Sequence, residues 1–129
     1  MLQLKIASKM EDSPEMDDLK LDLAHHIGTT AYHSSPLTVR YTDGVRALIQ
    51  HTNCGGLISD LSITAAMKFK HLRFQIWTIT VKNQGGLLTM KEDTNTPIRY
   101  SQKYDYLKFP EGTIDLYLIN GILLLPSEY

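Results

Sequence analysis

The chain has 129 residues, of which 43% are hydrophobic, and a domain of this size can bury a core without metal ions or disulfide bonds. Its 13 basic and 14 acidic side chains give a net charge of −1, which argues against both a basic DNA-wrapping protein and a strongly acidic DNA mimic. The single cysteine excludes an internal disulfide, and no apolar run approaches the roughly 20 residues that cross a bilayer. We therefore expect a protein of the cytoplasm, with no signal peptide and no membrane partner.

The N-terminal segment combines an alternating pattern with a run of carboxylates. Three apolar residues among the first six alternate with other residues, which favours a short strand or an arm that pairs with another chain. Five carboxylates and Pro14 follow, so residues 1–18 are expected to form an extended arm or an acidic connector. Leucines then recur at four-residue spacing and predict a helix over residues 17–26, although the same leucines would equally face one side of a strand.

Two further helices are predicted, and they complete a helical part over residues 19–67. An irregular loop over residues 28–39 precedes them. Thr42 or Asp43 can cap the first of these helices, and an apolar stripe follows. The segment 53–56 contains two glycines and is expected to end that helix, because glycine adopts a left-handed conformation easily. The second is expected over residues 57–67.

Beyond residue 71 the hydrophobic pattern changes from a helical period to that of strands. Residues 72–81 are rich in β-branched and aromatic side chains on both faces, which is typical of a central strand that is buried on both sides for most of its length. Asn120-Gly121 lies between two apolar runs and favours a type I′ hairpin turn, after which the chain is expected to finish inside its core. We predict one domain over residues 1–129. Its fold is α+β, with short N-terminal helices followed by an antiparallel β-meander of about five strands over residues 72–129.

No catalytic or metal-binding constellation is evident in the sequence. Five histidines are present, but none has the spacing of a metal motif. Cys54 has His51 three residues upstream and could be a nucleophile, although a lone cysteine at a helix junction is more often a packing residue. Its glycine-rich surroundings could also offer backbone amides to an anion, and helix termination explains the same glycines without a ligand. We expect no cofactor and no metal.

The remaining candidates are basic, aromatic and acidic side chains. A basic cluster near Phe69 and Phe74 could receive a nucleotide or a single strand, whereas a solvated helix-to-strand connection explains it as well. Trp77 lies mid-strand, so it is more often a core residue or an interface anchor than a stacking platform. The residues that could contact a ligand are Tyr32, Tyr41, Arg46, Arg73, Trp77 and Arg99, and those that could contact a protein partner are Glu11, Asp12, Glu15, Asp17 and Asp18.

Four segments together resemble a known but uncharacterised family. They are Gly28-Thr-Thr-Ala-Tyr-His33, Tyr41-Thr-Asp-Gly-Val45, Phe74-Gln-Ile-Trp77 and Leu124-Leu-Pro-Ser-Glu-Tyr129. The family consists of small proteins of phages and bacterial mobile elements, and the resemblance covers roughly residues 27–129. The chain departs from it at Gly55-Gly-Leu-Ile-Ser-Asp60, where members carry an aromatic-tryptophan-leucine step, so a ligand site built on that tryptophan is not expected here. The resemblance implies a small intracellular accessory protein and supplies no activity.

Three functional hypotheses follow. The first is a non-enzymatic inhibitor of the anti-defence type, such as an anti-CRISPR, which covers a surface of a host protein complex, for example a CRISPR-associated nuclease, with help from the acidic segment. The second is a sponge that sequesters a small nucleotide-derived signal at a subunit interface. The third is a small enzyme that uses Cys54 or a histidine. Direct binding of nucleic acid is not expected, whereas unpaired strand edges favour a homodimer.

Overall fold

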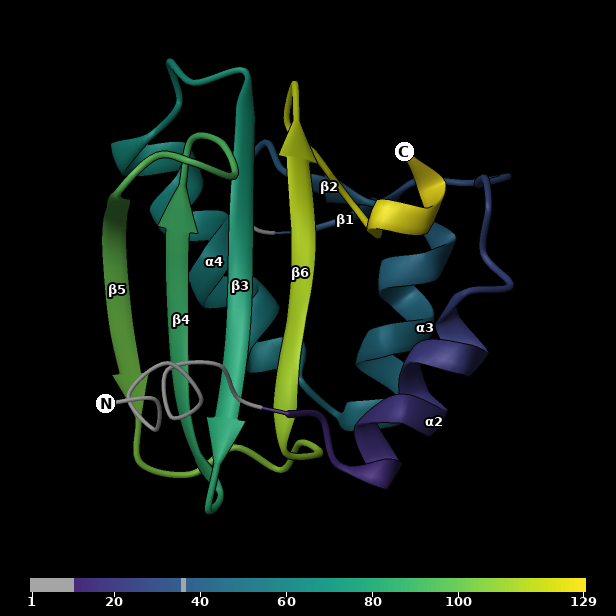
Figure 1. The fold of residues 1–129 in the computed structure, drawn as a ribbon. Coiled ribbons are helices and arrows are strands. Elements are labelled where there is room, and N and C mark those ends of the chain that lie inside the picture. Colours follow the sequence, from purple (N-terminus) through teal and green to yellow (C-terminus); the bar gives the residue numbers. More distant parts are fainter. Residues whose placement is uncertain (1–10, 36) are drawn as a thin grey trace.

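The computed structural model describes residues 11–35 and 37–129, so the alternating segment predicted near the N-terminus lies outside the described residues. These residues form three α-helices, a sheet and a terminal 3₁₀-helix, arranged as in Figure 1. In chain order the elements are α2 (Pro14–Leu23), β1 (His33–Ser34), β2 (Arg40–Tyr41), α3 (Asp43–Thr52), α4 (Gly55–Lys68), β3 (Phe74–Lys82), β4 (Gly85–Lys91), β5 (Ile98–Tyr104), β6 (Gly112–Ile119), β7 (Ile122–Leu124) and η1 (Pro126–Glu128). The predicted α+β class is confirmed.

Helix α2 begins earlier than its leucine spacing predicted. The Ser13 hydroxyl accepts a hydrogen bond from the amide of Met16 at 3.2 Å, and Pro14 occupies the first turn, where its missing N–H costs nothing. Residues 14–18, expected in the connector, therefore belong to the helix. Its buried side chains recur at helical spacing, which excludes the alternative of a strand: Met16, Leu19 and Leu23.

The junction between α3 and α4 corrects one detail of the prediction. Thr42 caps α3 as expected, because its hydroxyl accepts a hydrogen bond from the amide of Val45 at 3.3 Å. The helix then ends at Asn53, which takes the left-handed conformation at φ 59°, so no glycine performs this role. Gly55 and Gly56 begin α4 instead. Asparagine tolerates this conformation better than most residues, which explains why the glycine signal misled the prediction.

The sheet has seven strands in the order β1-β2-β7-β6-β3-β4-β5. Strands β3, β4 and β5 form a meander, but β6 crosses back to pair antiparallel with β3. Strand β7 then pairs with the other edge of β6. Two short strands are present beyond the predicted five: β1 lies within the segment expected to be an irregular loop, and β2 directly follows that segment. The second of them, β2, runs parallel to β7, with Arg40 opposite Ile122 and Tyr41 opposite Leu123.

Two hairpin turns place non-glycine residues at positive φ. Asn120 (φ 51°) and Gly121 (φ 81°) form the predicted turn between β6 and β7. Asn83 (φ 51°) and Gln84 (φ 67°) form the turn between β3 and β4, so the glycine pair that follows them opens β4. The expectation that the chain finishes inside its core is wrong, because η1 follows β7 and the side chain of Tyr129 is 78% exposed.

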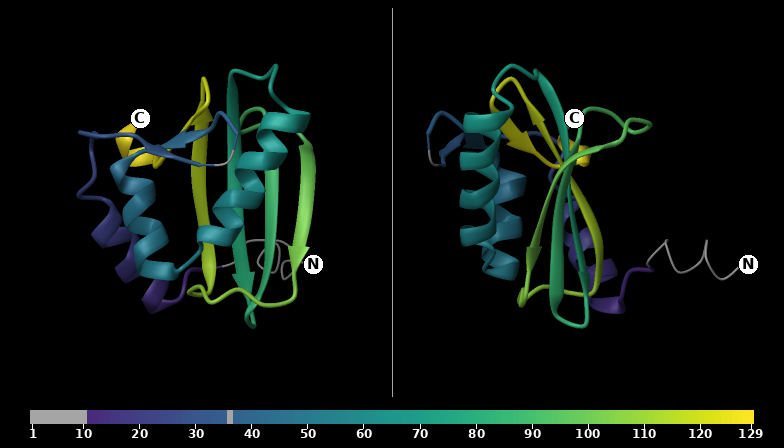
Figure 2. Two further views of the ribbon diagram at one scale, coloured as in Figure 1. Left: turned by 180° about the vertical axis from the view of Figure 1, so that it is seen from behind. Right: turned by 90° about the vertical axis from the view of Figure 1, so that its left-hand side faces the viewer.

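Helices α3 and α4 lie on one face of the sheet, whereas α2 lies beside the sheet near β6, and the opposite face is open among the described residues. Figure 2 shows α3 and α4 on one side of the strands, with α2 beside α3. Side chains of β3 alternate accordingly: Trp77 and Ile79 are buried beneath the helices, whereas Thr78 and Thr80 lie on the open face and are half-buried. Strand β3 pairs with β4 on one side and β6 on the other, so the predicted central strand is confirmed. The expectation that this strand is buried on both sides for most of its length is wrong, and Trp77 belongs to the core.

Candidate functional site

A carboxylate from the end of the chain lies at the N-terminus of α3. The Oε1 atom of Glu128 accepts hydrogen bonds from the Thr42 hydroxyl at 2.6 Å and from the amide of Leu125 at 2.9 Å, and its Oε2 atom accepts one from the amide of Gly44 at 3.2 Å. The first amides of a helix have no partner within the helix, and this end carries partial positive charge. Glu128 supplies both an acceptor for a free amide and a negative charge, although it is far from α3 in sequence.

The neighbouring side chain, Asp43, connects α3 to the loop before β1. Its Oδ2 atom accepts hydrogen bonds from the amide and hydroxyl of Thr30, both at 2.9 Å, and its Oδ1 atom lies 2.9 Å from Nε2 of His33. The backbone amide of Asp43 donates to the Thr29 hydroxyl at 2.9 Å. The bonds from Thr30 and His33 favour the ionised carboxylate and hold the pKa of Asp43 well below its ordinary value.

Gly44 allows Glu128 to approach α3 this closely. A Cβ atom at Gly44 would lie 2.6 Å from Oε1 of Glu128 and 2.7 Å from Cδ1 of Leu125, so both side chains would have to shift from these positions. We call the set formed by this approach the C-terminal junction; it comprises Thr29, Thr30, His33, Thr42, Asp43, Gly44, Leu125 and Glu128.

The last residue packs on the open face of the sheet, beside the C-terminal junction. The ring of Tyr129 meets that of Tyr117 edge-on, with centroids 5.4 Å apart and planes at 88°, and lies 6.2 Å from the ring of Phe74. Phe74 and Tyr117 are themselves 5.4 Å apart. Such pairs are favourable beyond the area they bury. These contacts place Tyr129 at a fixed position while leaving most of its surface exposed.

A cavity of about 430 Å³ opens between the C-terminal junction and the turn that joins β6 to β7. We call it the junction cavity. Its lining combines apolar side chains with hydroxyl, amide and carboxylate groups; the lining residues are Thr29, Tyr32, Thr42, Ile119, Asn120, Ile122, Leu124, Glu128 and Tyr129. This volume falls within the range of small-molecule sites, which combine an apolar wall with a few placed polar groups.

Two guanidinium groups stand beside the junction cavity. Arg40 lies over the ring of Tyr32, with its Cζ atom 5.4 Å from the centroid, and its strand position is paired with Ile122 in the cavity wall. Arg73 donates from Nε to Oδ1 of Asn120 at 3.3 Å, on the other side of the hairpin turn. Within residues 11–35 and 37–129, neither arginine forms an ion pair with a carboxylate.

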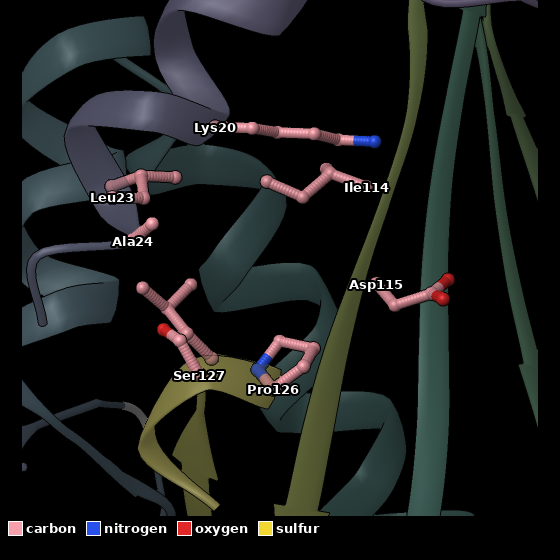
Figure 3. A pocket seen from close by; sticks show the side chains of 8 residues that line it. Lys20, Leu23, Ala24, Ile114, Asp115, Pro126 and Ser127 are labelled. Atoms are coloured by element: carbon pink, nitrogen blue, oxygen red, sulfur yellow. The ribbon is translucent and has the colours of Figure 1, made fainter. Parts of the chain in front are cut away.

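A smaller cavity of about 230 Å³ lies between α2, β6 and η1. Figure 3 shows Lys20 extending from α2 across β6, while the carboxylate of Asp115 points away from α2. Lys20 donates to Asp12 at 2.5 Å, and Asp115 accepts a hydrogen bond from the Thr78 hydroxyl at 2.7 Å. Since both charged groups already have partners and the other walls are mostly apolar, this cavity has little to orient a polar ligand.

Four segments that are distant in sequence thus lie around the junction cavity: residues 29–33, 40–44, 73–74 and 119–129.

Comparison with protein families matches residues 17–129 to a family described as a family of unknown function, DUF6876. The chain belongs to this family. No curated protein and no solved structure matches the chain. Membership of DUF6876 agrees with the resemblance to an uncharacterised family, and it supplies neither an activity nor a source.

In this DUF6876 chain, only part of the predicted ligand set comes together. Tyr32 lines the junction cavity, and Arg73 does not line it but donates to Asn120, which does. Trp77 is completely buried, with its indole N–H bonded to Oε1 of Gln75 at 2.8 Å. Tyr41 is half-buried and packs against His33, with ring centroids 5.4 Å apart. The remaining two are exposed and line no cavity described above: Arg46, on α3, and Arg99, on β5, where it pairs with Glu92.

Sequence reasoning missed three groups of this site: Arg40, Glu128 and Tyr129. Arg40 gave no signal, because an isolated arginine in a loop is ordinary. The Pro-Ser-Glu step after an apolar run resembles the beginning of a helical turn and could have indicated that the last strand ends at this point. That its carboxylate would cap α3 requires the pairing of β2 with β7, which no local pattern reveals.

The predicted acidic residues divide into a bonded and a free group. Asp12 accepts hydrogen bonds from Lys20 at 2.5 Å and from the amide of Thr113 at 2.9 Å. Partial burial acts to raise the pKa of Asp12, but these two donors outweigh it and the pKa is lowered. The free group is exposed and consists of Glu11, Glu15, Asp17 and Asp18.

The candidates for catalysis are in structural positions. Burial raises the pKa of the Cys54 thiol, which disfavours the reactive thiolate. His51 donates from Nδ1 to the carbonyl of Ala47 at 2.8 Å within its own helix. Among residues 11–35 and 37–129, no group of three or more histidine, cysteine or acidic side chains could hold a metal ion. None of the helices described is long and apolar enough to cross a membrane.

Proposed function

We propose that this protein acts by binding and not by catalysis, as an anti-defence factor of a phage or mobile element that covers a functional surface of a host protein complex. A CRISPR-associated nuclease is one candidate partner. The observation that carries the proposal is the acidic outer face of α2. Glu15, Asp18 and Asp22 follow the spacing i, i+3 and i+7, so they lie in one row, which we call the acidic row.

The acidic row is held on a fixed element. The opposite side of α2 buries Met16, Leu19 and Leu23 in the core, so the carboxylates face outward from a packed helix and not from a solvated connector. Residues 11–22 contain six carboxylates and one lysine, although the whole chain is near neutral. A local field of this sign would attract the basic groove of a nucleic-acid-binding protein and compete with its phosphate contacts.

The state of the titratable side chains favours binding over chemistry. Asp43 and Glu128 each accept three hydrogen bonds at the C-terminal junction, so both carboxylates already have structural partners. The Cys54 thiol is buried. These groups support recognition as the role of the surface.

The test is co-elution of the purified chain with candidate host defence complexes on a sizing column. The variant Glu15→Gln/Asp18→Asn removes two charges of the acidic row, and Asp93→Asn/Asp105→Asn removes two exposed charges elsewhere. We expect co-elution that weakens with added salt, that is lost in the first variant and that is retained in the second. Co-elution with no complex, or an equal loss in both variants, would contradict the proposal.

A further inference from the structure

We infer that the junction cavity is a binding site for a small aromatic anion of the nucleotide class, with the base against the tyrosine rings and the phosphate between Arg40 and Arg73. This inference goes beyond the proposed function, because it requires no partner protein and uses a surface separate from the acidic row.

The first support is the position of the two arginines. The turn formed by Asn120 and Gly121 joins β6 to β7; Arg40 stands on β2, the neighbour of β7, and Arg73 lies just before β3, the neighbour of β6. The two residues therefore flank the turn, with the Arg40 guanidinium over the ring of Tyr32 and the Arg73 side chain bonded to Asn120. Guanidinium matches phosphate in charge and geometry, and neither group is engaged by a carboxylate within the described part of the chain.

The second support is the composition of the wall. Tyr32 and Tyr129 are 52% and 78% exposed, yet both line the cavity. The contacts of Tyr129 with Phe74 and Tyr117 fix one ring before any ligand arrives. Exposed aromatic rings beside apolar side chains provide stacking surfaces for a base.

The third support is the set of polar atoms that remain free. The Oδ1 atom of Asn120 accepts from Arg73, so its NH₂ group remains available as a donor. The carboxylate of Glu128 is oriented by Thr42 and by two backbone amides, and it can still accept an N–H from a base edge. The cavity thus offers donors and acceptors to a base as well as positive charge to a phosphate.

The experiment measures affinity by calorimetry on the full chain with AMP, GMP, cyclic AMP and cyclic di-GMP. Adenosine and inorganic phosphate serve as half-ligand probes. We expect at least one nucleotide to bind, and each half-ligand to bind at least tenfold more weakly, because each makes only one set of contacts. Failure of all four nucleotides to bind at millimolar concentration would overturn the inference.

Variants locate the site. Arg40→Gln and Arg73→Gln replace exposed side chains, and each should weaken nucleotide binding about tenfold or more. Arg99→Gln, at the far edge of the sheet, is the matched control and should leave affinity unchanged. Equal affinity in all three variants would overturn the placement of the phosphate.

The proposed partner-binding surface and the proposed nucleotide site can be tested independently. The acidic-row variant Glu15→Gln/Asp18→Asn should bind nucleotide as tightly as the parent chain. Conversely, Arg40→Gln should co-elute with a host complex as the parent chain does. Loss of nucleotide binding in the acidic-row variant would contradict the location of the site in the junction cavity.

Discussion

Gly44 occupies the second position of α3, where most residues would be accepted. What excludes a side chain there is the approach of Glu128 and Leu125 from the other end of the chain. Gly56 occupies the corresponding position of α4 and would have nothing within 4 Å of an added Cβ. The two glycines therefore occupy the same position in their helices, but only Gly44 is in contact with a distant part of the chain.

This contrast gives the first prediction. Gly44→Ala should lower the free energy of unfolding by about 1–3 kcal/mol, because the added methyl group overpacks a site that cannot relax without breaking the Glu128 hydrogen bonds. Gly56→Ala should raise it by up to about 1 kcal/mol, because alanine favours the helix. Urea unfolding of both variants measures the difference. The same sign for both substitutions would contradict the close approach at Gly44.

The ionised state of Asp43 gives a prediction in acid. Its pKa is lower in the folded chain than the ordinary value of 3.8, so its contribution to stability is complete above that ordinary pKa. The contribution is lost as the pH falls through the ordinary value toward the folded one. The stability difference between the parent chain and Asp43→Asn should therefore be constant at neutral pH and shrink below about pH 4. A difference that does not change with pH would show that the charge is irrelevant.

At the scale of elements, local pattern predicted strands and turns well, and their partners poorly. The strand predicted over residues 72–81 and the Asn120-Gly121 turn depend on neighbouring residues alone, so sequence was sufficient. The pairing of β6 with β3 joins segments separated by two other strands, and no local pattern distinguishes it from a simple meander. The end of α3 shows the same limit, because the local glycine pattern did not indicate that Asn53 would take the left-handed conformation.

The two hairpin turns give the third prediction, since they differ mainly at their second residue. Gln84 holds φ 67° without the freedom of glycine, whereas Gly121 holds φ 81° with it. Gln84→Gly should stabilise the chain by about 0.5–1 kcal/mol, and Gly121→Gln should destabilise it by a similar amount. The backbone hydrogen bond from Leu107 to the Gln84 carbonyl, 2.7 Å long, is kept in the first variant. Thermal unfolding of the pair checks the expected opposite signs.

For the whole molecule, the sheet brings together residues 29–35, 37–44, 73–74 and 119–129 at one end. The sequence predicted Tyr32 and Arg73 as ligand contacts because their chemistry suits phosphate and base. It also predicted Trp77, whose burial follows from its place on the helix-covered face of β3. Which aromatic side chain reaches a cavity depends on sheet order and on the direction of the last residues, and neither is encoded locally.

The central claim is that Glu128 holds the end of the chain on α3 and so builds the wall of the junction cavity. Amide hydrogen exchange by NMR tests it directly at Gly44, whose N–H would otherwise be a free amide of the first helical turn. The parent chain should protect this amide, and Glu128→Ala should accelerate its exchange by about 10–100-fold while leaving Ile58, bonded within α4, unchanged. An exchange rate at Gly44 that is the same in both proteins would contradict the account.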